Sequence, residues 1–261
     1  MVEGRTVAST TKGRRLPRAV REQQMLDAAV TTFARRGYGA ASMDEIAELA
    51  GVSKPLVYLY LHSKEELFSA CVRREADALV TAVRAAVEGP DAPADRQLWS
   101  GLRGFFAHTA ERPDGWAVLY NQARTHGEPF AGEVAAMREE IITFVTQLIA
   151  AAAREDDCVP DLTDRDVAGL AYALVGAAES MAGWANGAEG SGESAKETAA
   201  LLMNFAWAGL ANLMEGRPWT PPRGGRRTSG ASTAAAPGSA PGPAPGPASG
   251  SASAPEAAPG S

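Results

Sequence analysis

The sequence predicts an all-α protein of about nine helices. Three observations lead to this prediction. The chain of 261 residues is rich in Ala, Leu, Glu and Arg, which are good helix formers. Few segments show the alternating β-branched pattern of a strand, and helix start and stop signals recur along the chain. Hydrophobic residues make up 45% of the chain, which suits a packed helical core.

The first helix is predicted from Pro17 to Arg36, with Gly37 as its C-terminal residue. Its apolar stripe consists of Leu26, Ala29, Val30 and Phe33. Because these residues recur at the helical period, we expect this face to be buried.

Two short helices are predicted next. Ser42 begins the first of them, and Glu45 three residues later completes the pattern of a capping box. Gly51 ends that helix. Ser53 is the expected N-cap of the following helix, and Pro55 lies in its first turn, where a missing N–H costs nothing.

Longer helices follow. The fourth is expected from Ser63, with a second capping box to Glu66, to about Glu88. Five more are predicted at Ala94–Glu111, Asp114–Arg124, Pro129–Arg154, Asp164–Ala185 and Ser194–Glu215.

Charge is unevenly distributed along the chain. The formal net charge is −6, which by itself argues against a nucleic-acid-binding protein. Residues 1–36, however, carry eight basic and three acidic side chains, a net charge of +5, so the remaining residues carry −11. A basic N-terminal region on an acidic body is a local footprint for DNA binding.

The two ends of the chain are not expected to fold. Residues 1–16 are predicted to be a flexible basic arm. Residues 220–261 consist almost wholly of Ala, Pro, Gly and Ser, and are predicted to be a disordered tail, because they cannot bury enough apolar surface to offset the entropy of ordering.

Other classes of protein receive no support from the sequence. Cys71 and Cys158 are far apart in sequence and predict neither a disulfide framework nor a zinc site. No signal peptide or transmembrane segment is recognisable, so we expect a cytoplasmic protein without membrane contact. The chain shows no catalytic constellation, so no enzymatic activity and no cofactor or metal are predicted.

The segment Ser42–Leu67 reads as a helix-turn-helix. Ile46, Ala47 and Ala50 are expected to face inward, and Val57 and Leu61, four residues apart, to anchor the second helix. The outward residues are then Lys54, Pro55, Leu56, Tyr58 and Tyr60. A helix N-terminus followed by a lysine and two tyrosines suits a surface that enters the major groove of DNA.

Residues 18–68 resemble the DNA-binding domain of the TetR family of transcriptional regulators. The matching positions include Phe33, Gly37-Tyr38, Ile46-Ala47, Ala50-Gly51-Val52-Ser53-Lys54, Tyr58, Ser63-Lys64-Glu65 and Leu67. The resemblance implies an N-terminal three-helix DNA-binding domain at residues 17–63 and a helical effector-binding and dimerisation domain at residues 64–219.

The resemblance also implies which residues contact DNA. They are Arg14, Arg15, Arg18, Ser42, Met43, Ser53, Lys54, Pro55, Leu56, Tyr58, Tyr60 and Lys64. Lys54, Pro55 and Leu56 would approach base edges, whereas Met43 and Lys64 would lie near phosphate. Leu56 departs from the small or hydroxylated residue that the family often has at this position, so it can contact a thymine methyl group but cannot hydrogen-bond a base.

In the second domain, the resemblance implies a cavity for a small, largely apolar effector and a homodimer formed through the last two helices. The candidate ligand-binding residues are Trp99, Phe105, Phe106, His108, Trp116, Tyr120, Asn121, Arg124, Met137 and Phe144. The expected function is a repressor that leaves a palindromic double-stranded operator when the effector binds.

Several alternatives remain open from sequence. The helix-turn-helix could be a plain helical hairpin, the aromatic residues could be ordinary core, and the last two helices could be internal to a monomer. The regulator could also lack a small-molecule effector and be controlled by a protein partner or act as an activator. An enzyme that carries a helix-turn-helix is the third reading, which the missing catalytic constellation disfavours.

Overall fold

The computed structural model describes residues 17–89, 91–155, 162–187, 194–217 and 219–220. By internal contacts the chain divides into two units, residues 1–219 and 220–261, and of the second unit only Thr220 is described. The predicted basic arm, including Arg14 and Arg15, the C-terminal tail and Cys158 lie outside the described residues.

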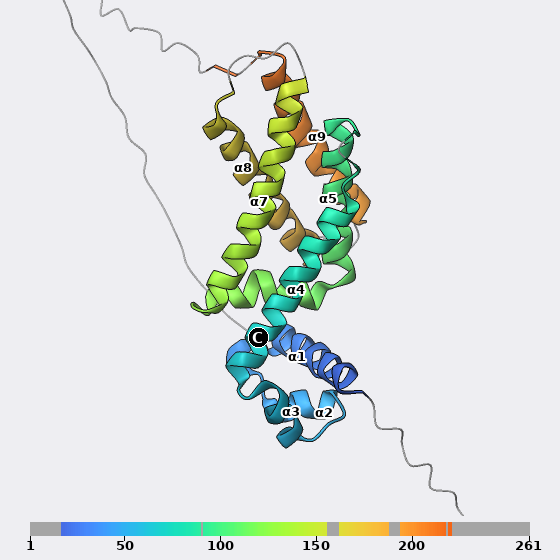
Figure 1. Ribbon diagram of the computed structural model, residues 1–261, viewed down its shortest axis with the longest axis vertical. Helices are drawn as coiled ribbons and strands as arrows, with labels where there is room; N and C mark the ends of the chain where they lie inside the picture. The colour runs from blue at the N-terminus through green and yellow to red at the C-terminus, as the bar shows by residue number, and fades with distance from the viewer. Residues whose placement is uncertain (1–16, 90, 156–161, 188–193, 218, 221–261) are drawn as a thin grey trace, which may run out of the picture. The chain divides into compact units, whose positions relative to one another are not determined.

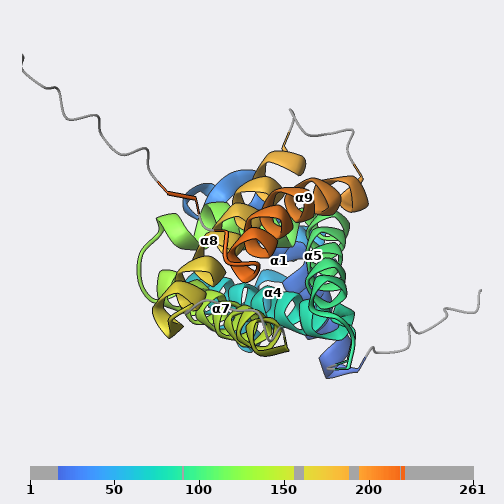
Figure 2. The ribbon, with the colours of Figure 1, turned by 90° about the horizontal axis from the view of Figure 1, so that it is seen from above.

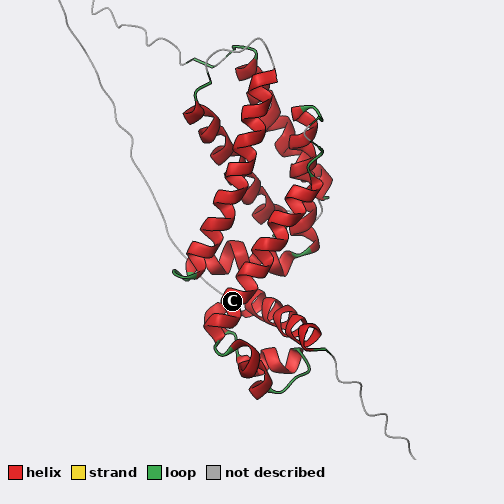
Figure 3. Cartoon of the chain, viewed as in Figure 1, coloured by secondary structure: helices red, strands yellow, loops and turns green. Residues whose placement is uncertain are grey.

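Within the described residues the chain forms nine α-helices and no strand, which confirms the all-α prediction (Figure 3). The N-terminal helices are α1 (Arg18–Ala40), α2 (Met43–Leu49), α3 (Lys54–Leu61) and α4 (Lys64–Ala86). They are followed by α5 (Ala94–Glu111), α6 (Pro113–Ala117), α7 (Phe130–Glu155), α8 (Asp164–Ala185) and α9 (Ala195–Met214). Between α6 and α7 lie a π-helical turn, η1 (Val118–Gln122), and a 3₁₀ turn, η2 (Ala123–Thr125).

Helix α4 belongs to both halves of the helical unit. Its first turns pack against α1 and α3, and the helix also contacts α5 and α7 (Figure 1). Near its start, Phe68 is fully buried among the rings of Phe33, Tyr38 and Phe130, with centroid distances of 4.7 to 4.8 Å. The contacts with Phe33 and Phe130 are edge-to-face and the contact with Tyr38 is tilted, and such aromatic packing adds to apolar burial, so it fixes α4 on α1 and on the start of α7.

The C-terminal body consists of α4 to α9 packed along one another. Helix α5 lies between α4 and α9, and α7 lies against α4 and α8 (Figure 2). Gly104 allows the close approach of α5 to α4, because a Cβ at this position would overlap the Cβ of Ala86. The apolar stripes of these helices converge on one continuous core.

Gly37 interrupts the first helix, as the sequence predicted. It takes a positive φ of 77° and a non-helical conformation, and a second, short helical stretch follows to Ala40, so α1 consists of two helices joined across a kink. The kink is held by a tertiary contact, since the amide of Tyr38 donates to Oε1 of Gln122 at 3.3 Å.

The helix predicted at Asp114–Arg124 needs a correction. The α-helix there covers only Pro113–Ala117, and the chain continues as η1 and η2. The sequence carries no glycine or proline at this transition, so the local signal for it is absent. In the folded chain the widened turn accompanies the stacking of Tyr120 on Trp116, whose ring centroids are 5.1 Å apart.

The predicted capping boxes formed only in part. The Ser42 hydroxyl accepts from the amide of Asp44, while Glu45 pairs with Arg36 at 3.1 Å instead of reaching back to the cap. The Ser63 hydroxyl accepts from the amide of Glu66, but no reciprocal bond from Glu66 is formed. Complete capping boxes occur instead at the starts of α8 (Thr163 with Asp166) and α9 (Ser194 with Glu197).

Candidate DNA-binding surface and ligand cavity

Helices α2 and α3 form the helix-turn-helix that the sequence predicted. Ile46 on α2 and Val57 on α3 are fully buried, and Leu61 is nearly so, which fixes the inner face of both helices. Gly51 takes a φ of 65° in the turn between them, a conformation that favours glycine. This packing leaves the other face of α3 to solvent.

The outer face of α3 carries most of the predicted base-reading residues. Lys54 and Pro55 are exposed, Tyr58 is exposed, and Leu56 is half-buried. The Lys54 ammonium lies 2.8 Å from Oδ2 of Asp44, and this hydrogen-bonded ion pair raises the pKa of Lys54. A DNA contact by Lys54 would therefore require this ion pair with Asp44 to open.

Leu59 on α3 is the exposed residue that the sequence reasoning did not single out. Its side chain is 67% exposed, more than that of Tyr58. The sequence could have predicted this exposure. Val57 and Leu61, four residues apart, define the buried face of α3, and Leu59 lies between them on the opposite face. An exposed leucine on this predicted DNA-facing side of α3 has the chemistry to contact thymine methyl groups.

At the start of α2, Ser42 and Met43 divide between surface and core. The Met43 side chain is buried, so only its backbone amide can approach a phosphate. Ser42 is exposed and caps the helix by accepting from Asp44. At α3, Ser53 is exposed at the N-cap but makes no side-chain capping bond, which differs from the prediction.

The predicted phosphate contact Lys64 is already engaged within the protein. Its Nζ donates to the carbonyl oxygen of Gly39 at 3.0 Å and lies 4.9 Å from the centroid of the Tyr38 ring. These contacts hold a positive charge at the N-terminus of α4. Arg18 also lies over an aromatic ring. Its guanidinium is 4.9 Å from the centroid of the half-buried Tyr60 ring on α3.

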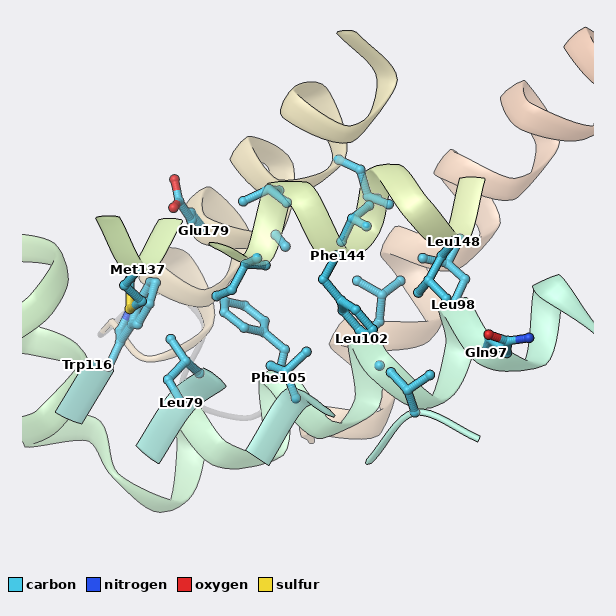
Figure 4. A pocket seen from close by; sticks show the side chains of 18 residues that line it. Leu79, Gln97, Leu98, Leu102, Phe105, Trp116, Met137, Phe144, Leu148 and Glu179 are labelled. Carbon is cyan, nitrogen blue, oxygen red and sulfur yellow. The ribbon is translucent and has the colours of Figure 1, made fainter. Parts of the chain in front are cut away.

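An apolar cavity of about 60 Å³ lies inside the body between α4, α5, α7 and α8 (Figure 4). Its lining residues are Leu79, Val83, Val87, Gln97, Leu98, Gly101, Leu102, Phe105, Trp116, Met137, Ile141, Phe144, Val145, Leu148, Leu174, Val175, Ala178 and Glu179. Gln97 and Glu179 are the polar exceptions, at opposite ends of the view.

The cavity brings together four of the ten predicted ligand-binding residues, namely Phe105, Trp116, Met137 and Phe144. The other six do not belong to the lining: Trp99, Phe106, His108, Tyr120, Asn121 and Arg124. Phe106 is core, and Asn121 and Arg124 are exposed. His108 is half-buried, and desolvation, with the nearby Arg112, lowers its pKa.

The sequence reasoning missed the contributions of α4 and α8 to the cavity. The sequence predicted a homodimer through the last two helices without distinguishing their faces. Leu174, Val175 and Ala178 of α8 are buried within this chain and line the cavity. Both roles need an apolar helical stripe, so periodicity alone does not distinguish them.

The polar end of the cavity is electrostatically balanced. Glu179 accepts from Nε of Arg138 at 3.0 and 3.1 Å, and Nη1 of Arg124 lies 3.7 Å from its Oε2. At the same end, Trp116 is buried between Phe105 and Tyr120, and its Nε1 has no hydrogen-bond partner among the described residues.

A chain of ion pairs connects the neighbourhood of the cavity to α1. Glu75 on α4 is 1% exposed and accepts three hydrogen bonds of 2.9 to 3.0 Å from Arg112, the residue that precedes α6. Arg74 donates to Glu75 and also to Asp27 on α1, at 2.8 and 2.7 Å. Gly115, beside the cavity residue Trp116, packs so closely on Glu75 that a Cβ there would collide with the carboxylate.

An apolar face on α8 and α9 remains uncovered in the single chain. Its exposed residues include Tyr172, Leu201 and, with 78% of its side chain exposed, Phe205. A shallow groove beside them is lined by Leu170, Ala173, Leu174, Ala177, Leu202, Phe205, Ala206, Gly209, Leu210 and Leu213. Large exposed apolar surfaces of this kind mark interaction sites.

Comparison with known proteins gives matches across both halves of the helical unit. Residues 25–71 match the profile described as bacterial regulatory proteins, tetR family. Residues 94–209 match the profile described as tetracyclin repressor-like, C-terminal domain. The HTH-type transcriptional activator FasR from Mycolicibacterium smegmatis is 36% identical over 148 residues, which cover 57% of this chain and 67% of FasR.

The chain belongs to the TetR family of transcriptional regulators. A crystal structure of a TetR-like regulator from Rhodococcus sp. RHA1 shares 41% sequence identity, covers 76% of this chain and 99% of its own, and superposes with a TM-score of 0.64. FadR from Bacillus subtilis in complex with stearoyl-CoA has a TM-score of 0.58 at 17% identity, covers 74% of this chain and 98% of its own, and shares the fold.

Membership in the family makes this protein a DNA-binding transcriptional regulator rather than an enzyme. The matched tetR-family profile covers most of α1, the helix-turn-helix of α2 and α3, and the start of α4. Among the residues described, no helix is both long and apolar enough to cross a membrane. No cluster of three potential His, Cys, Asp or Glu metal ligands occurs in the same part of the chain.

Proposed function

We propose that this TetR-family regulator binds a palindromic operator as a homodimer and is released by a small, largely apolar effector. The apolar cavity carries this proposal, because α4 contributes Leu79 and Val83 to its wall and also carries Lys64 at its other end, beside the helix-turn-helix. A ligand in the cavity therefore contacts the same helix that supports the DNA-binding domain.

The size of the cavity supports a coupled conformational change. Pockets for small ligands usually have volumes of ~300–1,000 Å³, whereas this cavity has about 60 Å³. A metabolite must therefore displace the helices that form the cavity wall. Because α4 is closely packed along its length, we expect it to move as a rigid helix. Release of DNA then needs only that the effector prefer the expanded state, with a coupling of ~1–3 kcal/mol.

The ion pairs of Glu75 extend this path to α1. A movement of Trp116 shifts Gly115 and Arg112 against the buried carboxylate, which in turn is connected through Arg74 to Asp27. We propose that these groups transmit the expansion to the DNA-binding domain.

The uncovered face of α8 and α9 supports the proposed homodimer. Two copies related by a two-fold axis would bury Leu201 and Phe205 in an isologous interface. Such a dimer would present its two α3 helices to successive major grooves, about 34–36 Å apart, and would select an inverted-repeat operator.

The proposal is tested by selecting bound duplexes from a random DNA pool with the full-length protein, then screening apolar metabolites for a rise in melting temperature. We expect an inverted repeat, and we expect stabilising metabolites to weaken operator binding about 5- to 150-fold in fluorescence anisotropy. Stabilising ligands that leave operator affinity unchanged would contradict the release mechanism.

The proposed DNA contacts are tested on the selected operator. Lys54→Ala is expected to change base preference, whereas Lys64→Ala and Tyr58→Ala are expected to weaken binding to all operators alike. Lys196→Ala, on the exposed start of α9, is the matched loss of a lysine and should leave affinity unchanged. Wild-type base preference in Lys54→Ala would remove Lys54 from the reading surface.

A second candidate is an activator, or a regulator without a small-molecule effector. The observation that favours an activator is the 36% identity to FasR, which is named a transcriptional activator. In vitro transcription from a promoter that carries the selected operator distinguishes the two, since a repressor lowers and an activator raises the amount of transcript.

A further inference from the structure

The indole N–H of Trp116 is a buried donor at the wall of the cavity that has no acceptor in the described part of the chain. The residue is 6% exposed, and its Nε1 makes no hydrogen bond there. Figure 4 shows the ring extending toward Met137 at the end of the cavity where Glu179 also lies. Proteins rarely leave such a group unsatisfied, because a buried polar group without a partner is costly.

The surroundings of Trp116 explain why the chain itself does not satisfy the donor. Phe105 packs edge-to-face at 5.6 Å and Tyr120 stacks at 5.1 Å, and both distances are between ring centroids. The Glu179 carboxylate, which lines the same cavity, is already held by Arg138. The indole group can only donate, so the missing partner must be an acceptor.

We infer that Trp116 donates a hydrogen bond to the effector, and that the effector is a mainly aliphatic molecule with one uncharged acceptor, such as a ketone or ester oxygen, at the Trp116 end. This inference rests on the proposed function of the cavity as the effector site. It adds the chemical class of the ligand and the residue that orients it.

The acceptor is inferred to be uncharged because the cavity has too few free hydrogen-bond donors to replace the hydration of an anion. Its wall is apolar except for Gln97 and Glu179. A carboxylate at the Trp116 end would lose its hydration with one N–H in compensation, because the two nearby cations, Arg138 and Arg124, are already paired with Glu179. A neutral carbonyl needs only the one donor that the structure provides.

The inference predicts an unusual combination of effects for Trp116→Phe. This variant keeps an aromatic ring but removes the unpaired donor, so the melting temperature of the ligand-free protein should stay the same or rise. A clear fall in melting temperature would show that the packing of the larger indole ring outweighs the cost of its unpaired donor, and would contradict this first prediction. The role of the donor itself is then decided by the ligand titration.

Ligand binding supplies the second measurement. Calorimetric titration of the full chain with 2-octanone and with 2-methyl-1-octene compares a carbonyl with its hydrocarbon isostere. The wild-type protein should prefer the ketone about tenfold, and Trp116→Phe should lose this preference while keeping its affinity for the hydrocarbon. Trp207→Phe is the matched control, since Trp207 is half-buried on α9 and does not line the cavity.

The possible failures are distinguishable. If both neutral probes bind equally and Trp116→Phe changes neither affinity, the assignment of Trp116 is wrong while the cavity remains a ligand site. If neither probe binds, the proposed function of the cavity fails together with the inference. Octanoate should bind more weakly than 2-octanone, and tighter binding of octanoate would overturn the uncharged acceptor.

Discussion

At the scale of single residues, Glu75 on α4 connects the segment before α6 with α1, through Arg112 and Arg74. Its carboxylate is buried, yet it is satisfied by Arg112 and Arg74. A buried charge is tolerated only when such partners are in place. The same residue therefore supports the fold and joins α4 to the segment before α6.

We predict that Glu75→Gln lowers the free energy of unfolding by about 3 kcal/mol, because it leaves two guanidinium groups without their shared carboxylate. Chemical denaturation of the two proteins measures the difference. Glu140→Gln is the control, since Glu140 forms an exposed ion pair with Arg84 and its loss should cost less than about 1 kcal/mol. Equal losses of unfolding free energy in the two variants would show that the buried Glu75 contributes no more to stability than an exposed ion pair.

His108 gives the fold a dependence on pH. Desolvation, with the charge of Arg112, lowers its pKa below the ordinary value of 6.5, so the unfolded chain takes up this proton first as the pH falls. We predict a loss of stability between pH 7.5 and pH 5.5 that is smaller in His108→Gln. A pH dependence unchanged by the substitution, in thermal melts at both pH values, would show that other groups cause it.

The environment of Cys71 disfavours redox chemistry at its thiol. It is fully buried, and desolvation raises its pKa to about 12. The reactive thiolate is therefore suppressed at neutral pH.

At the scale of helices, the close contact of α4 with α5 depends on Gly104. A methyl group at this position would overlap the Cβ of Ala86 on α4. This Cβ is attached directly to the backbone, so it cannot move aside by a change of rotamer. The contact decides how far apart the two walls of the cavity stand, since Val83 on α4 and Leu102 on α5 both line it.

We predict that Gly104→Ala destabilises the protein by about 1–3 kcal/mol through overpacking, despite the better helix propensity of alanine. Gly169→Ala on α8 is the matched control, because nothing lies within 4 Å of its expected Cβ. That variant should be more stable than the wild type by about 0.5–1 kcal/mol. Thermal or urea denaturation separates the two, and a stabilising Gly104→Ala would contradict the packing argument.

At the scale of the whole molecule, the face of α8 and α9 decides whether two chains associate. Phe205 is mostly exposed in the single chain, so substituting it should have little effect on the stability of that chain. In the proposed dimer the same side chain is buried, and a charge there would lose its hydration.

We predict that Phe205→Glu yields a monomer in analytical ultracentrifugation and lowers operator affinity. Val20→Glu is the control for self-association, since Val20 is also exposed but lies on α1. It should leave the dimer intact. Dimers that persist in Phe205→Glu would place the interface elsewhere.

The sequence by itself determined the all-α class, the helix-turn-helix and the position of most helices. These depend on local patterns: the periodicity that buries Ile46, Val57 and Leu61, and the positive φ that favours glycine at Gly51. A resemblance over about fifty residues then indicated the family that the comparisons confirmed.

Only the tertiary structure decided which apolar residues line the cavity and which remain exposed. Leu174 and Phe205 both belong to apolar helical stripes, yet one faces the cavity and the other faces solvent. The contact of Tyr38 with Gln122 and that of Glu75 with Arg112 likewise join segments 84 and 37 residues apart. Such pairings depend on how helices pack in space, and local sequence periodicity carries no information about that.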